Sequence, residues 1–128
     1  MSEDERAVLI VDDDPDILDA LRQIIEDEGY IVACSTNGEE ALRYLRSGHR
    51  PRLILLDLMM PVLDGWQFLD ARRSDPLLSS IPVVVVSATA ANFQGRGPQD
   101  QPEVNAVLSK PVALDRLLSF VETFCRAS

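Results

Sequence analysis

Carboxylate, hydroxyl and amine side chains stand directly behind four apolar runs of this sequence, where they could act together in chemistry. Runs of large aliphatic residues predict strands that are buried on both faces, as in a parallel sheet. The carboxyl ends of parallel strands meet at one edge of the sheet, and ligands of open α/β sheets bind there. We therefore expect one site, built from Asp12 and Asp13 behind residues 7–11, Asp57 behind residues 53–56, Ser87 behind residues 81–86, and Lys110 behind residues 106–108.

The acids of this set predict a cation site. Carboxylates that converge within a few ångström repel each other, so they either bind a cation or retain a proton. A cluster of oxygen ligands without His or Cys favours Mg²⁺ over zinc. Asp13 and Asp57 are the expected direct ligands, together with a backbone carbonyl near Met59, whereas Asp12 would act through water.

The same residues suit phosphoryl transfer to a carboxylate. An aspartate at a magnesium site can attack a phosphoryl group and form an acyl phosphate, provided that the incoming charge is neutralised. Lys110 would supply a second positive charge, and the Ser87 hydroxyl can hydrogen-bond the phosphoryl oxygens. Ala88, the small residue next to Ser87, leaves room for the group.

Helix signals alternate with the strands. The expected helices begin behind Asp14, Asn37 and Asp64 and end at Gly29, at Gly48 and before Pro76; a short strand covers residues 30–34, and a last helix covers residues 114–125. Gly and Pro interrupt residues 91–103, where we expect a short or irregular element. Five strands alternating with helices imply a doubly wound α/β fold, with a parallel sheet covered on both faces. The 128 residues fit one domain, with its core at about residues 6–126.

Charge and composition exclude several classes of function. The net charge of −9, from 21 acidic and 12 basic residues, argues against binding nucleic acid or an anionic membrane surface. No apolar run approaches the ~20 residues of a membrane span, and the acidic N-terminus is unlike a secretory signal, so we expect a cytoplasmic protein. Cys34 and Cys125 lie in or beside apolar runs without metal-ligand spacing, which predicts free, buried thiols.

Four motifs, in this order and at these spacings, resemble the receiver domain of two-component response regulators over essentially the whole chain. They are Val11-Asp12-Asp13-Asp14, Leu56-Asp57 with Met60-Pro61 and Asp64-Gly65, Val86-Ser87-Ala88, and Ser109-Lys110-Pro111. The resemblance implies a flavodoxin-like sheet of order 2-1-3-4-5, a phosphoacceptor at Asp57, and a cis Lys110–Pro111 bond. It also implies that a sensor histidine kinase or a phosphotransfer protein donates the phosphoryl group. Such a domain catalyses only its own phosphorylation and dephosphorylation and switches partner binding, so it is not an enzyme toward a separate substrate.

The sequence departs from the family's pattern at three places. Val107 stands where receivers commonly carry Tyr or Phe, and the segment 91–103 is broken by Gly and Pro. Met59 and Thr89 occupy positions that influence how readily water attacks the acyl phosphate. An apolar Met59 could shield the phosphoryl group, which predicts a comparatively long-lived phosphorylated form.

Other functions compete with this interpretation. A degenerate receiver could act as a constitutive protein-binding module. A phosphatase of the haloacid dehalogenase type needs a second acid where Met59 stands, and a flavin carrier needs a phosphate loop where Asp12 begins an acidic run. Arg72 and Arg73 are expected on a solvated helix face, and His49 is given no role. The downstream target, the oligomeric state and whether the domain stands alone stay open.

Overall fold

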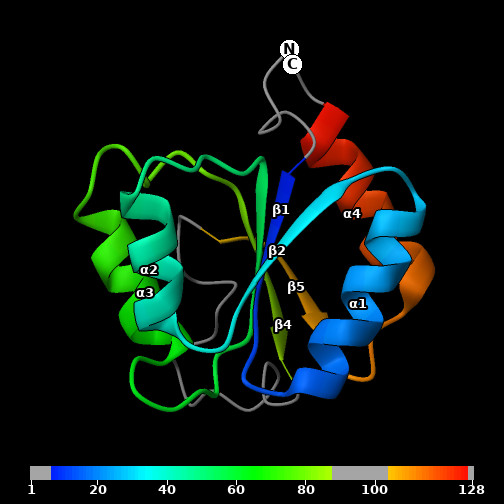
Figure 1. Cartoon of the computed structure of the whole chain (residues 1–128), viewed down its shortest axis with the longest axis horizontal. Coiled ribbons are helices and arrows are strands. Elements are labelled where there is room, and N and C mark those ends of the chain that lie inside the picture. Colours follow the sequence, from blue (N-terminus) through cyan, green and yellow to red (C-terminus); the bar gives the residue numbers. More distant parts are fainter. Residues whose placement is uncertain (1–6, 88–103, 127–128) are drawn as a thin grey trace.

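The computed structural model describes residues 7–87 and 104–126 and contains one five-stranded parallel sheet in the order β2-β1-β3-β4-β5 (Figure 1). The strands are β1 (Ala7–Val11), β2 (Ile31–Ser35), β3 (Leu53–Leu56), β4 (Val83–Ser87) and β5 (Val104–Ser109). The helices described are α1 (Pro15–Asp27), α2 (Gly38–Arg46), α3 (Gly65–Arg73) and α4 (Leu114–Arg126). The predicted doubly wound α/β class and strand order are confirmed. The predictions for Ala88, Thr89 and residues 91–103 lie outside the described residues.

Helices cover both faces of the sheet, with α1 and α4 on one side and α2 and α3 on the other (Figure 1). Successive strand residues point to opposite faces. In β1, Val8 and Ile10 therefore join the core under α1 and α4, whereas Leu9 and Val11 join the core under α2 and α3. Burial on both faces explains why β1, β3 and β4 are continuous aliphatic runs rather than alternating ones.

Side-chain caps fix where three of the helices begin. The Asp14 carboxylate accepts hydrogen bonds from the N–H groups of Asp16 and Ile17, and Pro15 occupies the first turn of α1. Asn37 caps α2 in the same way. Asp64 forms a capping box with Gln67 at α3, which confirms the sequence interpretation of a cap at this position. Each cap stabilises its helix by about 1 kcal/mol and places the preceding loop at the carboxyl edge of the sheet.

The prediction of two buried thiols is half wrong. Cys125 is buried, but Cys34 is exposed. Cys34 lies in β2, which is an edge strand that pairs only with β1. An edge strand receives less cover than a central one, so the apolar run of β2 is only partly buried.

The prediction of a solvated pair at Arg72 and Arg73 is wrong for Arg72. Arg73 is exposed, but Arg72 keeps only 2% of its surface accessible. Its guanidinium donates hydrogen bonds to the carbonyl oxygens of Ser79 and Ile81, which join the end of α3 to the segment that leads into β4. No helix among the described residues has the length and apolar composition needed to cross a membrane.

Candidate functional site

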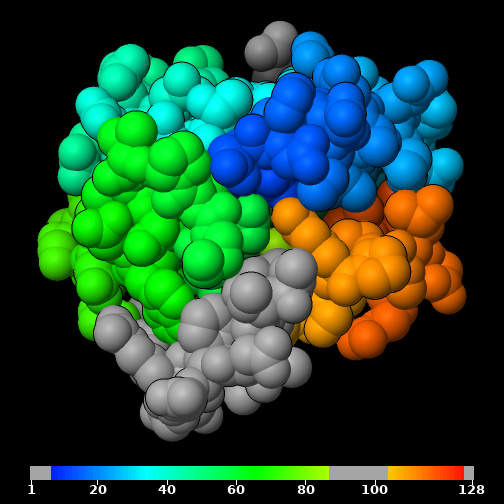
Figure 2. All heavy atoms as spheres, turned by 90° about the horizontal axis from the view of Figure 1, so that it is seen from below, coloured from blue at the N-terminus to red at the C-terminus, as the bar shows by residue number. Residues whose placement is uncertain are grey.

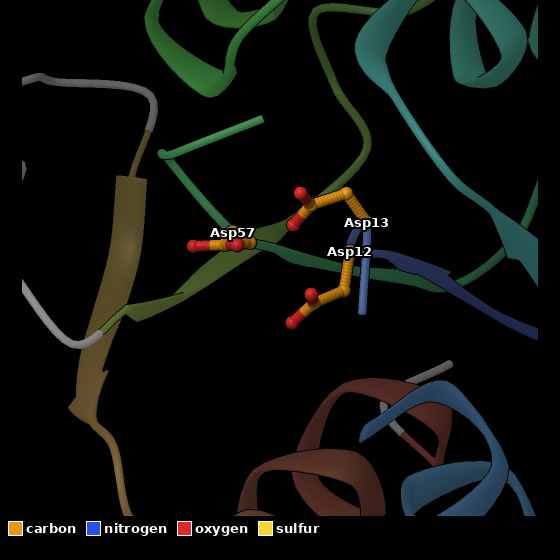
Figure 3. Close-up of side chains that lie close together, drawn as sticks. All are labelled: Asp12, Asp13 and Asp57. Carbon is orange, nitrogen blue, oxygen red and sulfur yellow. The ribbon is translucent and has the colours of Figure 1, made fainter. Parts of the chain in front are cut away.

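Three carboxylates converge at the carboxyl edge of the sheet. Ligand oxygens of Asp12, Asp13 and Asp57 all lie within 4.8 Å of one another, and Figure 3 shows the side chains gathered beyond the ends of β1 and β3. In the view onto this edge, the segments that follow β1 (blue), β3 (green) and β5 (orange) meet near the centre (Figure 2). The predicted gathering of acids from distant parts of the sequence is thereby confirmed.

Backbone pairing holds two of these acids in place. The N–H of Asp12 donates to the Ser35 carbonyl at 3.0 Å, and the N–H of Asp57 donates to the Val11 carbonyl at 2.9 Å. Each residue thus extends its strand by one further hydrogen bond. Asp12 and Asp57 are 3% and 5% exposed, whereas Asp13 is exposed, so the cluster opens to solvent on the Asp13 side.

The Lys110 ammonium completes the cluster. Its Nζ atom lies 2.8 Å from Asp12 Oδ2 and 3.6 Å from Asp57 Oδ2. The Lys110–Pro111 peptide bond is cis, as the resemblance implied. The predicted approach of Lys110 to the acids is confirmed, and its ammonium contacts two of the three carboxylates, those of Asp12 and Asp57.

The electrostatics of the cluster favour an added positive charge. Burial and the negative charge of Asp12 raise the pKa of Asp57. The positive charge of Lys110 and the hydrogen bond from the Met59 N–H lower it, but by less, so the pKa of Asp57 lies above its ordinary value. Burial lowers the pKa of Lys110, but its hydrogen bond to Asp12 and the charges of Asp12 and Asp57 raise it more, so it lies above the usual range. Lys110 therefore stays charged at neutral pH but leaves the negative charge of the cluster only partly balanced.

The residues present fit a divalent cation. All three side chains offer hard carboxylate oxygens, which Mg²⁺ and Ca²⁺ prefer, and no His or Cys belongs to the cluster. Asp13 and Asp57 are placed to hold such an ion. Met59 lies beside them, and its N–H is 3.3 Å from Asp57 Oδ1.

The loop between β3 and α3 sets the position of Asp57 through close backbone contacts. A Cβ atom on Gly65 would lie 2.6 Å from both the Asp57 carbonyl oxygen and the Leu58 Cα atom, so only glycine fits there. Val62 adopts a φ of 68°, and the Leu63 N–H donates to the Pro61 carbonyl at 2.8 Å. Gly65 was named from the sequence only as part of the Asp64-Gly65 motif, and its contact with Asp57 was missed.

Ser87, Val107 and Met59, which were also predicted for the site, lie on or next to strands β3, β4 and β5. Ser87 is the last residue of β4, opposite Ser109 of β5, and only its backbone is described. Val107 is partly buried in β5 and packs on the core under α2 and α3. Met59 is 60% exposed. His49, which was given no role, is exposed and stacks on the Tyr44 ring with centroids 4.1 Å apart.

A doubly wound sheet with an acidic cluster and a lysine at its carboxyl edge defines a receiver-like domain. The family model of the response regulator receiver domain matches residues 8–122. The chain therefore belongs to the response regulator receiver domain family.

Similar proteins include short and long chains. An uncharacterized 14.6 kDa protein of Leptolyngbya boryana is 36% identical over 120 residues, which cover 94% of this chain and 90% of that protein. The response regulator Rre1 of Synechocystis is 38% identical over 119 residues, which cover 90% of this chain and 49% of Rre1. The chain thus spans nearly the full length of one relative and about half of the other.

One solved structure shows the likeness of the fold. The receiver domain of the sensor histidine kinase PA1611 from Pseudomonas aeruginosa, solved with a magnesium ion coordinated in its active-site cleft, superposes with a TM-score of 0.84. It is 24% identical, and the match covers 95% of this chain and 98% of that one.

Proposed function

We propose that this receiver domain accepts a phosphoryl group on Asp57 in a reaction that requires Mg²⁺, and that the modification switches its binding to a partner protein. The single observation that carries the proposal is the convergence of Asp12, Asp13 and Asp57 with the Lys110 ammonium at one edge of the sheet. A sensor histidine kinase or a phosphotransfer protein would donate the group. The downstream partner is taken to be a protein, because the chain's net charge of −9 opposes contact with nucleic acid or an anionic membrane.

Different side chains of the site have different roles in phosphoryl transfer. An Asp57 carboxylate oxygen forms a bond to phosphorus while the bond between phosphorus and the donor nitrogen breaks. Asp13, Asp57 and the Met59 carbonyl would hold Mg²⁺, with Asp12 acting through water. When bound, the ion supplies positive charge that offsets the charge on the transferred group.

Lys110 and Ser87 stabilise the phosphoryl group once it is attached. In the unphosphorylated chain the Lys110 ammonium is hydrogen-bonded to Asp12 and lies close to Asp57. It can turn to a phosphoryl oxygen without leaving the cluster. Ser87 ends the neighbouring strand and would donate its hydroxyl hydrogen to another phosphoryl oxygen. Thr89 and Met59 would govern the access of water to the acyl phosphate.

The same geometry disfavours the competing functions. A phosphatase of the haloacid dehalogenase type needs a general acid two residues beyond the nucleophile, and Met59 has no titratable group. We infer that the domain catalyses only its own phosphorylation and dephosphorylation. The paired Lys110 and acids also disfavour a degenerate binding module, because such a module has no need for a buried charged cluster.

The proposal is tested by intact mass after incubation with acetyl phosphate. Wild type should gain one phosphoryl adduct with Mg²⁺ and none with EDTA, and Asp57→Asn should gain none. Asp19→Asn is the matched control, because Asp19 is an exposed acid on α1 outside the cluster. An adduct on Asp57→Asn, or an adduct that does not depend on Mg²⁺, would refute the proposed chemistry.

A further inference from the structure

The amino edge of the sheet carries a second feature, at the opposite end from Asp57. A cavity of about 450 Å³ opens between the segments that lead into β3 and β4 and the last turns of α4. This volume lies within the ~300–1,000 Å³ of small-molecule sites. Its lining includes two basic residues and several apolar ones, namely Arg50, Arg52, Leu77, Ile81, Pro82 and Phe124. We call it the Arg50–Arg52 pocket.

Two guanidinium groups line this pocket without a carboxylate partner in the described part of the chain. The ion pairs found among the described residues involve other cations. The Arg52 Nε–H is buried and has no hydrogen-bond partner there. A buried donor without an acceptor costs free energy, so the fold leaves part of the Arg52 guanidinium unsatisfied.

Backbone carbonyl groups outside the pocket lining accept hydrogen bonds from both arginines. Arg50 Nη1 donates hydrogen bonds to the carbonyl oxygens of Leu45 and His49, which fixes one side of its guanidinium. The Arg52 N–H donates to the Ala7 carbonyl at 2.9 Å, which ties its backbone to β1. Two neighbouring guanidinium groups, that of Arg50 held by hydrogen bonds, suit the oxygens of a carboxylate or phosphate.

Apolar side chains complete the pocket. Leu77 is 66% exposed on its rim, Ile81 is buried, and Phe124 is partly buried. Covering Leu77 with an apolar group would remove hydrophobic surface from water. In a chain of net charge −9, a local pair of cations beside an apolar surface is a distinct feature.

We propose that the Arg50–Arg52 pocket binds a small amphipathic anion, in which a carboxylate or phosphate group is joined to an apolar body. The charged group contacts Arg50 and Arg52, and the apolar body lies on Leu77 and Phe124. The site is separate from Asp57 and does not depend on phosphoryl transfer.

The test is an NMR titration of the full chain, carried out in EDTA on the Asp57→Asn background so that the acidic cluster takes no part. The probes are hexanoate and hexyl phosphate, with 1-hexanol and hexylamine as neutral and cationic controls of equal chain length. We expect saturable shifts at Arg52, Ile81 and Phe124 with the anions only. The anion with the lower Kd shows whether the pocket prefers a carboxylate or a phosphate group.

Variants make the assignment specific. Arg52→Gln should weaken anion binding about tenfold, as expected for the loss of a charge-assisted contact. Arg52→Lys, which retains the charge, should weaken it less, and Arg46→Gln on the exposed face of α2 should leave it unchanged. Equal binding of 1-hexanol, or unchanged binding by a folded Arg52→Gln, overturns the proposal. Binding seen only after neutralising Glu3, Asp4 and Glu5 also overturns it, because the chain's own acids would then be the occupant.

Discussion

Asp57 is costly to the fold in the absence of a cation. Burial and the neighbouring Asp12 raise the pKa of Asp57, which means that its charged form is less favourable in the folded state than in the unfolded chain. The penalty is absent at a pH below the unfolded pKa of ~3.9, and it grows as the pH rises through the folded pKa. The charged Asp57 therefore weakens the fold at neutral pH.

We expect Asp57→Asn to raise the free energy of unfolding at about pH 7 in EDTA by roughly 0.5–2 kcal/mol, the usual range for a stabilising substitution. The gain should shrink as the pH falls through the raised pKa, because wild-type Asp57 is then protonated. Urea unfolding at several pH values measures this. A gain that stays constant down to about pH 3 would exclude the titration of Asp57 as its cause.

Val62 is strained. A β-branched residue with a φ of 68° is an outlier that costs ~1–3 kcal/mol. We expect Val62→Gly to stabilise the fold by about 1 kcal/mol, after subtraction of the greater chain entropy of glycine. Val112→Gly is the control, because Val112 lies in a loop without a positive φ and should lose stability. Urea unfolding measures the free energy of unfolding of both variants. A lower value for Val62→Gly than for wild type contradicts the strain argument.

At the scale of elements, the start of α2 contains a charge-dependent contact. The N–H and the hydroxyl of Thr36 donate to the Glu40 carboxylate at 2.8 and 2.9 Å, and these bonds lower the pKa of Glu40. The stabilisation is present above the unfolded pKa of ~4.3 and is lost as the pH falls through the lower folded pKa.

Glu40→Gln should therefore lower the free energy of unfolding at about pH 7, by less than ~1 kcal/mol because the group is exposed to solvent. The difference from wild type should vanish in acid, at a pH below the folded pKa of Glu40. Glu39→Gln, which loses only an exposed pair with Arg43, serves as the control. A deficit of Glu40→Gln that persists in acid would show that the contact does not depend on charge.

The start of α3 is packed directly against Asp57 and Leu58. Gly65→Ala places a Cβ atom against the backbone of Asp57 and Leu58, which cannot move aside as a side chain can. We expect a loss of stability of ~1–3 kcal/mol, together with weaker Mg²⁺ binding as followed by Trp66 fluorescence. In Gly48→Ala, the φ of 112° is strained but no atom lies within 4 Å, so stability should fall without a change in Mg²⁺ affinity. Equal Mg²⁺ affinity in both variants would contradict the role given to Gly65.

At the scale of the whole molecule, the residues alone predicted a parallel doubly wound sheet with acids gathered at its carboxyl edge, whereas the strand order was predicted through the resemblance to receiver domains. The runs that form β1 and β3 are buried on both faces, and the acids that follow them are marked by position alone. Other features depend on contacts that no local pattern encodes. Cys34 is exposed because β2 lies at the sheet edge, and Arg72 is buried because carbonyl oxygens of a later segment face it.

The cost of the acidic cluster and the cation binding proposed for it have the same origin in uncompensated negative charge, and together they predict a reversal of stability. A ligand that binds only the folded state stabilises it by RT ln(1 + [L]/Kd), about 2.7 kcal/mol at one hundred times Kd. In EDTA, Asp57→Asn should be more stable than wild type, whereas at saturating Mg²⁺ wild type should be the more stable protein, because it alone keeps all three carboxylates. Thermal unfolding across a Mg²⁺ series measures both, with Asp19→Asn expected to follow wild type. If the unfolding temperatures of wild type and Asp57→Asn rise equally with the Mg²⁺ concentration, Asp57 is not a metal ligand.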